Sequence, residues 1–216
     1  KEILLNKILV TGGCGFIGAN WMDRLLARGE RAVAFDNLSR RGAVKNAEWL
    51  RAKYGSQFEL IRADVRDAPA LADAARDADA IYHLAAQVAV TTSLTDPRSD
   101  FEINALGTFN ALEAARASGR NPLFLFASTN KVYGEMDDVP VVERATRYAF
   151  GDLPGGASEA QPLDFHSPYG CCYSADTDIL TRRGWKKFYE LVPEDDVLTY
   201  SLERKVAEYQ RPTAHF

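Results

Sequence analysis

The first 130 residues alternate short apolar runs with segments of helical periodicity. Five runs have the β-branched and aromatic bias of buried strands, namely residues 7–11, 31–35, 58–62, 80–84 and 122–128. Apolar side chains recur at helical spacing between them, in the segment that ends at Gly29 and in residues 43–54, 70–75 and 101–118. Strands that alternate with helices predict a doubly wound parallel α/β sheet.

The pattern changes beyond residue 171. Short alternating runs at residues 178–180 and 197–200 indicate small β-strands of a different architecture. Two adjacent cysteines, Cys171 and Cys172, mark the change. We therefore expect an α/β domain over residues 1–171 and a partial β-rich segment over residues 172–216.

Three glycines follow the first expected strand at the spacing G-x-x-G-x-x-G. Gly12 allows a tight turn, Gly15 lets the backbone approach a pyrophosphate, and Gly18 lets the next helix pack closely on the strand. Phe16 and Ile17 lie between these glycines, and we expect them to border the cofactor. The N-terminus of the helix that follows would face the phosphates. This strand–loop–helix context predicts a Rossmann-like dinucleotide site.

The second expected strand ends in Asp36, about 20 residues beyond the glycine loop. A carboxylate there accepts hydrogen bonds from both ribose hydroxyls and repels the 2′-phosphate of NADP. Asn37, Ser39 and Arg40 follow, and we expect them to border the same cofactor. An Asx turn or a helix cap is the alternative role for Asp36, and Arg40 with Arg41 would suit a phosphate. The carboxylate favours NAD.

The ends of the later strands add further candidates. Asp64 and Val65 follow the third strand, where Asp64 either bonds the adenine amino group or caps the helix that begins near Ala68. His83 lies in an apolar strand, which favours a packed, hydrogen-bonded histidine over a catalytic one. The remaining residues expected to border the cofactor are Leu84, Ala85, Ala86, Asn104 and Ser128.

Four ordered motifs carry a family resemblance: TGGCGFIG at 11–18, HLAA at 83–86, STNKVYG at 128–134 and SPYGC at 167–171. Together they resemble an extended short-chain dehydrogenase/reductase of the nucleotide-sugar epimerase and dehydratase group. The strings DNLSRRGA, QVAVTTS, DFEIN and QPLDFHSPYG resemble its CDP-paratose 2-epimerase (tyvelose epimerase) branch. The resemblance covers about residues 7–171.

The resemblance implies an enzyme that oxidises a nucleotide sugar transiently to a keto-sugar with NAD and then returns the hydride. Tyr169 would be the catalytic acid/base, and Thr129 would hydrogen-bond the same sugar oxygen. A tyrosine near pKa 10 needs a neighbouring cation to act as a base at pH 7. The family supplies a lysine four residues later, whereas this chain has Tyr173. The motif is interrupted, so this chain alone is expected to be inactive.

The sequence from Cys172 onward resembles the amino-terminal block of an intein, the Hint fold. In that interpretation the Cys172 thiol is the splicing nucleophile and attacks the carbonyl of Cys171. Excision would join Cys171 to Ser-x-Lys and restore the lysine. The alternative is that Cys172 is a small buried residue of an epimerase helix. His215 lies at the wrong spacing for the next intein block and is taken as incidental.

Two alternatives to this assignment stay open. One is a 4,6-dehydratase or a 4-epimerase; acidic residues usually follow the threonine in the dehydratase, and Asn130 and Lys131 stand there instead. The other is one arm of a split intein, whose partner chain supplies the rest.

Composition and charge indicate which other classes of protein the chain does not resemble. The net charge is −4, from 26 basic and 30 acidic residues, and no basic stripe indicates nucleic-acid binding. There is no signal peptide and no apolar run of about 18 residues, so we expect neither secretion nor a membrane span. Three cysteines do not make a disulfide framework, and cytoplasmic localisation is the default. No metal site is predicted. The ends, Lys1 and Phe216, look cut, and the spliced enzyme is expected to be a homo-oligomer.

Overall fold

The computed structural model describes residues 6–153, 155–158, 160–165, 167, 169, 178–187, 192, 194–201 and 206–211. The chain divides into two compact units, residues 1–173 and residues 174–216. Each unit is described by itself below.

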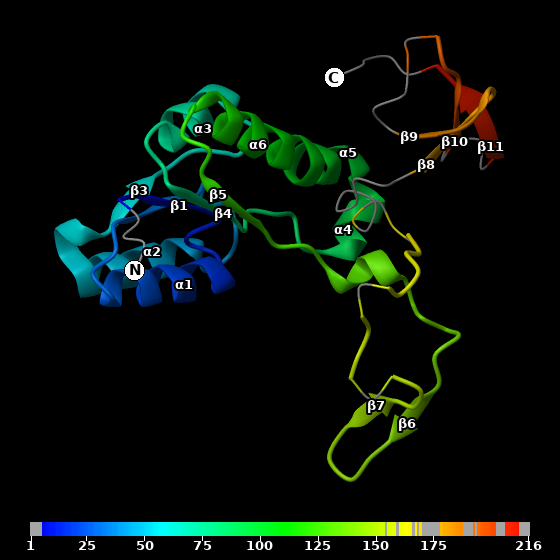
Figure 1. The fold of residues 1–216 in the computed structure, drawn as a ribbon, viewed down its shortest axis with the longest axis horizontal. Coiled ribbons are helices and arrows are strands. Elements are labelled where there is room, and N and C mark those ends of the chain that lie inside the picture. Colours follow the sequence, from blue (N-terminus) through cyan, green and yellow to red (C-terminus); the bar gives the residue numbers. More distant parts are fainter. Residues whose placement is uncertain are drawn as a thin grey trace. The chain divides into compact units, whose positions relative to one another are not determined.

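A parallel sheet of five strands organises the first unit (Figure 1). Its strands are β1 (Ile8–Thr11), β2 (Ala32–Phe35), β3 (Glu59–Ile61), β4 (Ala80–His83) and β5 (Leu123–Phe126). Their order is β3-β2-β1-β4-β5, so the chain leaves the centre in one direction and returns to build the other side. Leu9 of β1 pairs with Val33 on one side and with Ile81 on the other. The predicted doubly wound parallel sheet is confirmed.

Helices cover both faces of this sheet. One face is covered by α1 (Phe16–Ala27) and α2 (Ala43–Tyr54), and the other by α3 (Ala68–Ala75) and α6 (Gly107–Ala117), as Figure 1 shows. A single 3₁₀ turn, η1 (Gly55–Gln57), connects α2 to β3. The first two helices and the first four strands lie where the apolar pattern predicted them, within a few residues at each end.

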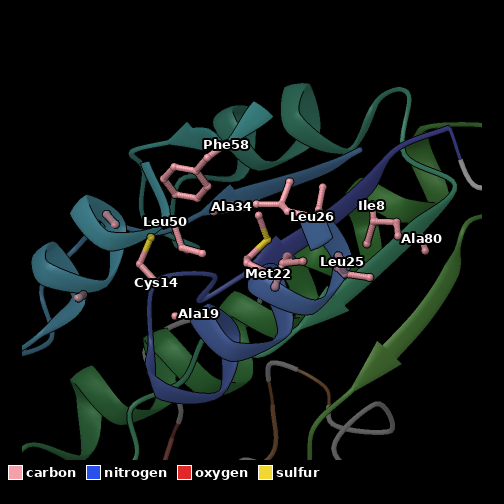
Figure 2. Packing of buried hydrophobic residues seen from close by; sticks show 14 residues of the cluster. Ile8, Cys14, Ala19, Met22, Leu25, Leu26, Ala34, Leu50, Phe58 and Ala80 are labelled. Carbon is pink, nitrogen blue, oxygen red and sulfur yellow. The ribbon is translucent and has the colours of Figure 1, made fainter. Parts of the chain in front are cut away.

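Alternating side chains of the central strands divide the core into two layers. Ile8 and Val10 face α1 and α2, whereas Leu9 faces α3 and α6. Figure 2 shows the first layer, in which Met22 and Leu26 of α1 pack toward the sheet. All four residues of β1 and of β2 are buried, which explains why these strands read as continuous apolar runs.

The helix predicted over residues 101–118 begins earlier and is not uniform. It starts at α5 (Pro97–Phe101), passes through a π-helical turn, η2 (Glu102–Leu106), and continues as α6. Asp96 caps it by accepting a hydrogen bond from the N–H of Ser99 at 3.1 Å, and Pro97 occupies the first helical position. A further short helix that the pattern did not predict, α4 (Val90–Thr95), precedes it.

The fifth strand forms the end of the described sheet. Leu123 and Leu125, which share one face of β5, are 60% and 42% exposed, and within the described residues no further strand pairs with β5. The chain then forms a 3₁₀ turn, η3 (Asn130–Tyr133), and a separate antiparallel pair, β6 (Val141–Glu143) and β7 (Tyr148–Phe150).

The second unit contains an antiparallel sheet of four strands in the order β11-β10-β8-β9. The strands are β8 (Asp178–Thr181), β9 (Gly184–Lys187), β10 (Val197–Ser201) and β11 (Val206–Gln210). Asp195, which is almost fully buried, accepts hydrogen bonds from Arg183 at 2.8 Å and from the N–H of Val192 at 2.9 Å. The two predicted strands are present, and β9 and β11 add to them.

Candidate cofactor site

A cavity of about 610 Å³ lies at the carboxyl ends of β1, β2, β3 and β4. This is the point at which the strand order reverses, where open α/β sheets bind ligands. Every residue predicted to border the cofactor lines it, except Asn104 and Ser128.

The glycine loop forms the floor of this cavity with no room for side chains. Gly12 has a φ of +67°, and a Cβ there would lie 2.8 Å from the backbone nitrogen of Ala85. A Cβ on Gly18 would lie 2.0 Å from the carbonyl oxygen of Gly12. Gly15 caps α1 without a side-chain hydrogen bond, so the first N–H groups of the helix, at Phe16 and beyond, keep their capacity for an anion.

Asp36 joins the end of β2 to the glycine loop. One carboxylate oxygen accepts a hydrogen bond from the N–H of Cys14 at 2.9 Å, and the other accepts one from the N–H of Leu38 at 2.8 Å. The second bond is the Asx turn that the sequence left open as an alternative. Each oxygen has a further lone pair for a ligand, so the turn and a ribose contact are compatible. Burial and the Asp36 charge raise the pKa of the Cys14 thiol to about 12, so this thiol stays protonated.

The carboxylate of Asp64 accepts four hydrogen bonds from neighbouring groups. It accepts two hydrogen bonds from the guanidinium of Arg66, one from the Arg66 N–H and one from Asn37 at 2.7 Å. These bonds, with those to Arg66 first, hold the pKa of Asp64 well below its usual range. Four donors fill the acceptor sites of a carboxylate, so an adenine amino group would compete with them. Asp67, not Asp64, caps α3.

The end of β4 is fixed by His83. The ring is 1% exposed, lies 2.8 Å from the Thr11 hydroxyl and 3.2 Å from the Thr108 hydroxyl, and stacks on Phe124 and Phe126. Burial lowers its pKa to about 4. The prediction of a packed, hydrogen-bonded histidine is confirmed.

Asn104 and Ser128 do not line the cavity, and their contact with a cofactor stays a prediction. Asn104 is 1% exposed and uses its amide to bond the backbone of Gln87 and the carboxylate of Asp100. Because it lies on the inner face of its helix, its side chain points into the protein interior, behind the cavity wall. Ser128 is exposed beyond the end of β5.

Two polar side chains that were not predicted to border the cofactor, Asn46 and Gln87, line the cavity. Asn46 of α2 lines it and donates a hydrogen bond to the carbonyl of Cys14 at 2.9 Å, which supports the glycine loop from the helix side. Gln87 lines it and bonds Asp100 at 2.8 Å. Asn46 was detectable as a polar residue between Ala43 and Ala47 on the buried face of an amphipathic helix.

The candidate catalytic residues are described only in part. Thr129 caps η3 by accepting a hydrogen bond from the N–H of Lys131 at 3.3 Å, and Tyr169 is 9% exposed. Cys171, Cys172, Tyr173 and His215 lie outside the described residues. Among the residues that are described, no group of His, Cys, Asp or Glu side chains is placed to hold a metal ion. No helix in that part of the chain has the length and apolarity that a membrane span requires.

The strand order, the glycine loop and the acidic residue at the end of β2 define a Rossmann-like α/β protein. The family model for GDP-mannose 4,6 dehydratase matches residues 9–182. The chain therefore belongs to the nucleotide-sugar epimerase/dehydratase family.

Individual relatives agree with this assignment. The CDP-paratose 2-epimerase of Salmonella typhi is 44% identical over 171 residues, which are 78% of this chain and 50% of that protein. The dTDP-glucose 4,6-dehydratase of Mycolicibacterium smegmatis is 31% identical over 185 residues, 85% of this chain and 50% of that protein. This chain thus spans about half the length of these relatives.

Solved structures show the same fold. The UDP-glucose 4-epimerase of Thermus thermophilus in complex with NAD has a TM-score of 0.60 at 35% identity, over 78% of this chain and 48% of that one. The UDP-Glc/GlcNAc 4-epimerase of Campylobacter jejuni has a TM-score of 0.63 at 29% identity, over 78% of this chain and 46% of that one.

Proposed function

We propose that residues 1–171 are the cofactor-binding half of an NAD-dependent nucleotide-sugar epimerase of the CDP-paratose 2-epimerase type. The observation that carries the proposal is the cavity at the strand reversal, with the Asp36 carboxylate bonded to the glycine loop. The 44% identity to the Salmonella typhi CDP-paratose 2-epimerase supports the choice of branch. The Thermus thermophilus structure with NAD supports the choice of cofactor.

The residues that line the cavity fit a dinucleotide. The glycines leave backbone at the cavity floor where a Cβ would clash, and the N–H groups at the start of α1 suit a diphosphate. Asp36 retains acceptor capacity for ribose hydroxyls and a charge that opposes a 2′-phosphate. Bound NAD would accept a hydride from a sugar carbon and return it.

The chain's own part in that chemistry is to hold and move a proton. Tyr169 would take the proton of the sugar hydroxyl, and the hydroxyl of Thr129 would orient the same oxygen. A tyrosine with its usual pKa near 10 is almost wholly protonated at pH 7, so it needs a cation beside it. The position four residues after Tyr169 holds Tyr173. We therefore propose that the 216-residue chain does not turn over substrate by itself.

A 4-epimerase or a 4,6-dehydratase is the second candidate. The relative from Mycolicibacterium smegmatis and the name of the matching family model favour a dehydratase. Asn130 and Lys131 oppose it, because the acidic residues expected after the threonine are absent from the sequence there. Epimerisation at carbon 2 or carbon 4 would be separated by the products formed from CDP- and UDP-sugars by the spliced enzyme.

We also propose that residues 172–216 are the opening of an intein, either contiguous or split. Two observations support it: the α/β unit ends at residue 173, and the following unit contains an antiparallel sheet. Excision of the complete intein would join Cys171 to a following Ser-x-Lys and restore a lysine four residues after Tyr169. The spliced product would then be the active enzyme.

Calorimetric titration with NAD and with NADP tests the cofactor assignment. We expect the spliced enzyme to bind NAD more tightly than NADP, and the 216-residue chain to bind NAD more weakly than the spliced enzyme. Tighter binding of NADP would refute the role given to Asp36. Substrate turnover by the purified 216-residue chain would refute the proposal that it is inactive alone.

A further inference from the structure

A buried chain of hydrogen bonds starts at Thr11, the last residue of β1. Its hydroxyl oxygen accepts hydrogen bonds from the N–H groups of Leu84 and Ala85, each at 3.2 Å. The Leu84 N–H is shared with the backbone carbonyl of Thr11, at 3.1 Å. Both donors approach the acceptor side of the hydroxyl oxygen, so its hydrogen is left to donate. Nδ1 of His83 lies 2.8 Å away. Thr11 therefore donates to Nδ1, which must be the unprotonated nitrogen of the ring.

The other ring nitrogen continues the chain. Thr108 donates its hydroxyl hydrogen to the carbonyl of Asn104 at 2.6 Å, so its oxygen is an acceptor toward His83. Nε2 of His83 lies 3.2 Å from that oxygen and donates to it. Every donor meets an acceptor only when the ring is neutral and carries its hydrogen on Nε2. Burial lowers the pKa of His83 to about 4, which keeps the ring neutral at pH 7.

The chain of bonds returns to the segment where it began. The Asn104 side chain accepts a hydrogen bond from the N–H of Gln87 at 2.8 Å and donates to the Gln87 carbonyl at 3.2 Å. Leu84 and Ala85 are thus held from the β1 side, and Gln87 from the helix side. All three line the cavity, whereas His83 lies behind it.

We propose that His83, as the neutral Nε2–H tautomer, is a positioning residue that fixes the segment from Leu84 to Gln87 as a wall of the cofactor cavity. The segment has little freedom to move inward, because a Cβ placed on Gly12 would already lie 2.8 Å from the Ala85 nitrogen. The identity of the ligand rests on the function proposed above. The positioning itself depends only on the hydrogen bonds of this chain.

Three variants of the 216-residue chain test the proposal. His83→Phe keeps an aromatic ring between its neighbours but leaves the Thr11 hydroxyl hydrogen without its acceptor. His83→Asn keeps an acceptor oxygen near Thr11 and is the conservative variant. Ile81→Val removes one methyl group from the same buried strand, with no change in hydrogen bonding, and is the matched control for lost packing.

Hydrogen exchange and calorimetry give the main readouts. In His83→Phe we expect exchange of the Ala85 and Gln87 amides to accelerate about tenfold beyond any change in the β1 amides, as expected for the loss of a buried hydrogen bond. We expect the Kd for NAD to rise by about the same factor. His83→Asn should recover most of both effects, and Ile81→Val should change the β1 and segment amides alike. Nitrogen-15 shifts of wild-type His83 at pH 7 should report hydrogen on Nε2.

Contrary results are equally definite. The proposal would be overturned if the nitrogen-15 shifts placed the hydrogen on Nδ1. It would also be overturned if the Ala85 and Gln87 amides exchanged as slowly in His83→Phe as in the wild type. If His83→Phe does not fold, Thr108→Val removes the acceptor of Nε2–H and is read by the same exchange measurement. If the spliced wild-type enzyme does not bind NAD, the proposed function fails, while the exchange result still decides the role of His83.

Discussion

The carboxylate of Asp36 accepts a hydrogen bond from the backbone N–H of Cys14 at 2.9 Å, which ties the end of β2 to the glycine loop. Two features that were predicted separately, an acidic residue and a glycine triplet, are therefore one structure. The same carboxylate shapes the loop and faces the cavity.

We predict that Asp36→Asn weakens NAD binding about tenfold or more, because hydrogen bonds to a charged group contribute about 1.5–3 kcal/mol. NADP binding should fall less, because the repulsion of its 2′-phosphate is removed with the charge. Competitive calorimetry with the two cofactors measures the ratio. Asp23→Asn, which removes an equal charge from α1 outside the cavity, is the control and should leave the ratio unchanged. An unchanged ratio in Asp36→Asn would contradict the assignment.

Gly18→Ala should disrupt the glycine loop. The new Cβ would lie 2.0 Å from the Gly12 carbonyl oxygen, so the backbone must shift. We expect a loss of about 1–3 kcal/mol in the free energy of unfolding and loss of NAD binding. Gly155→Ala is the matched control, because its Cβ would meet no atom within 4 Å. Chemical denaturation measures the free energy of unfolding of both variants. Equal values would contradict the prediction and show that the backbone can shift to accommodate a Cβ at Gly18.

Stability should fall as the pH drops from 6.5 to about 4. The pKa of His83 is lowered by burial from 6.5 to about 4, so in this window the unfolded chain binds a proton that the folded chain does not. The stabilisation is complete above pH 6.5 and amounts to about 3 kcal/mol by linkage. Asp64, whose pKa is lowered from 3.8, acts in a separate window below that value. Denaturation across this range in wild type and His83→Asn should give a steeper slope for the wild type.

The exposed face of β5 should drive self-association of the 216-residue chain. Leu123 and Leu125 project from a strand that has no further partner among the described residues. Leu125→Lys should therefore lower the apparent mass of the chain in light scattering. Leu94→Lys, at a similarly exposed leucine of α4, is the control. In the spliced enzyme we expect Leu125→Lys to destabilise the fold instead, because the rest of the enzyme would cover this face of β5.

Cys172 should be the splicing nucleophile in a version of the chain extended through a complete intein. Cys172→Ala should abolish splicing, because no thiol remains to attack the Cys171 carbonyl. Cys171→Ala should largely preserve it. Mass spectrometry of the products distinguishes the two. The reverse result would place the boundary one residue away, and splicing unaffected by both changes would reject the intein interpretation.

The sequence predicted the parallel sheet and most of the cavity because both depend on local signals. Buried strands such as β1 appear as continuous apolar runs, and the glycine spacing identifies the loop between β1 and α1. Helix α4 was missed because Val90, Thr91 and Thr92 favour strands locally, and tertiary packing overrides that preference. The start of the next helix at Pro97, earlier than the predicted residue 101, has a local signal in the pair Asp96-Pro97, a capping residue followed by a proline at the first helical position.

The parts of the site that the sequence did not reveal have a different origin. Asn104 and Ser128 were assigned to the cofactor by their position along the chain. That position does not show whether a side chain points into the cavity or away from it. Asn104 turns inward to Gln87, and Ser128 remains exposed. The helical pattern marks Asn46 as a polar residue on a buried face, but its partner, the Cys14 carbonyl, is distant in sequence and no local pattern identifies it. The bond from Gln87 to helix α5 likewise joins separate segments.

The order of strands also sets the sequence of events during synthesis of the chain. Val33, one partner of Leu9, is synthesised soon after it, whereas the other partner, Ile81, leaves the ribosome much later. The glycine loop, Asp36 and Asp64 can assemble on three strands before β4 exists, whereas the wall from Leu84 to Gln87 cannot. Until then one edge of β1 is open to other chains, so a pause in translation before β4 would favour misassembly over the native sheet.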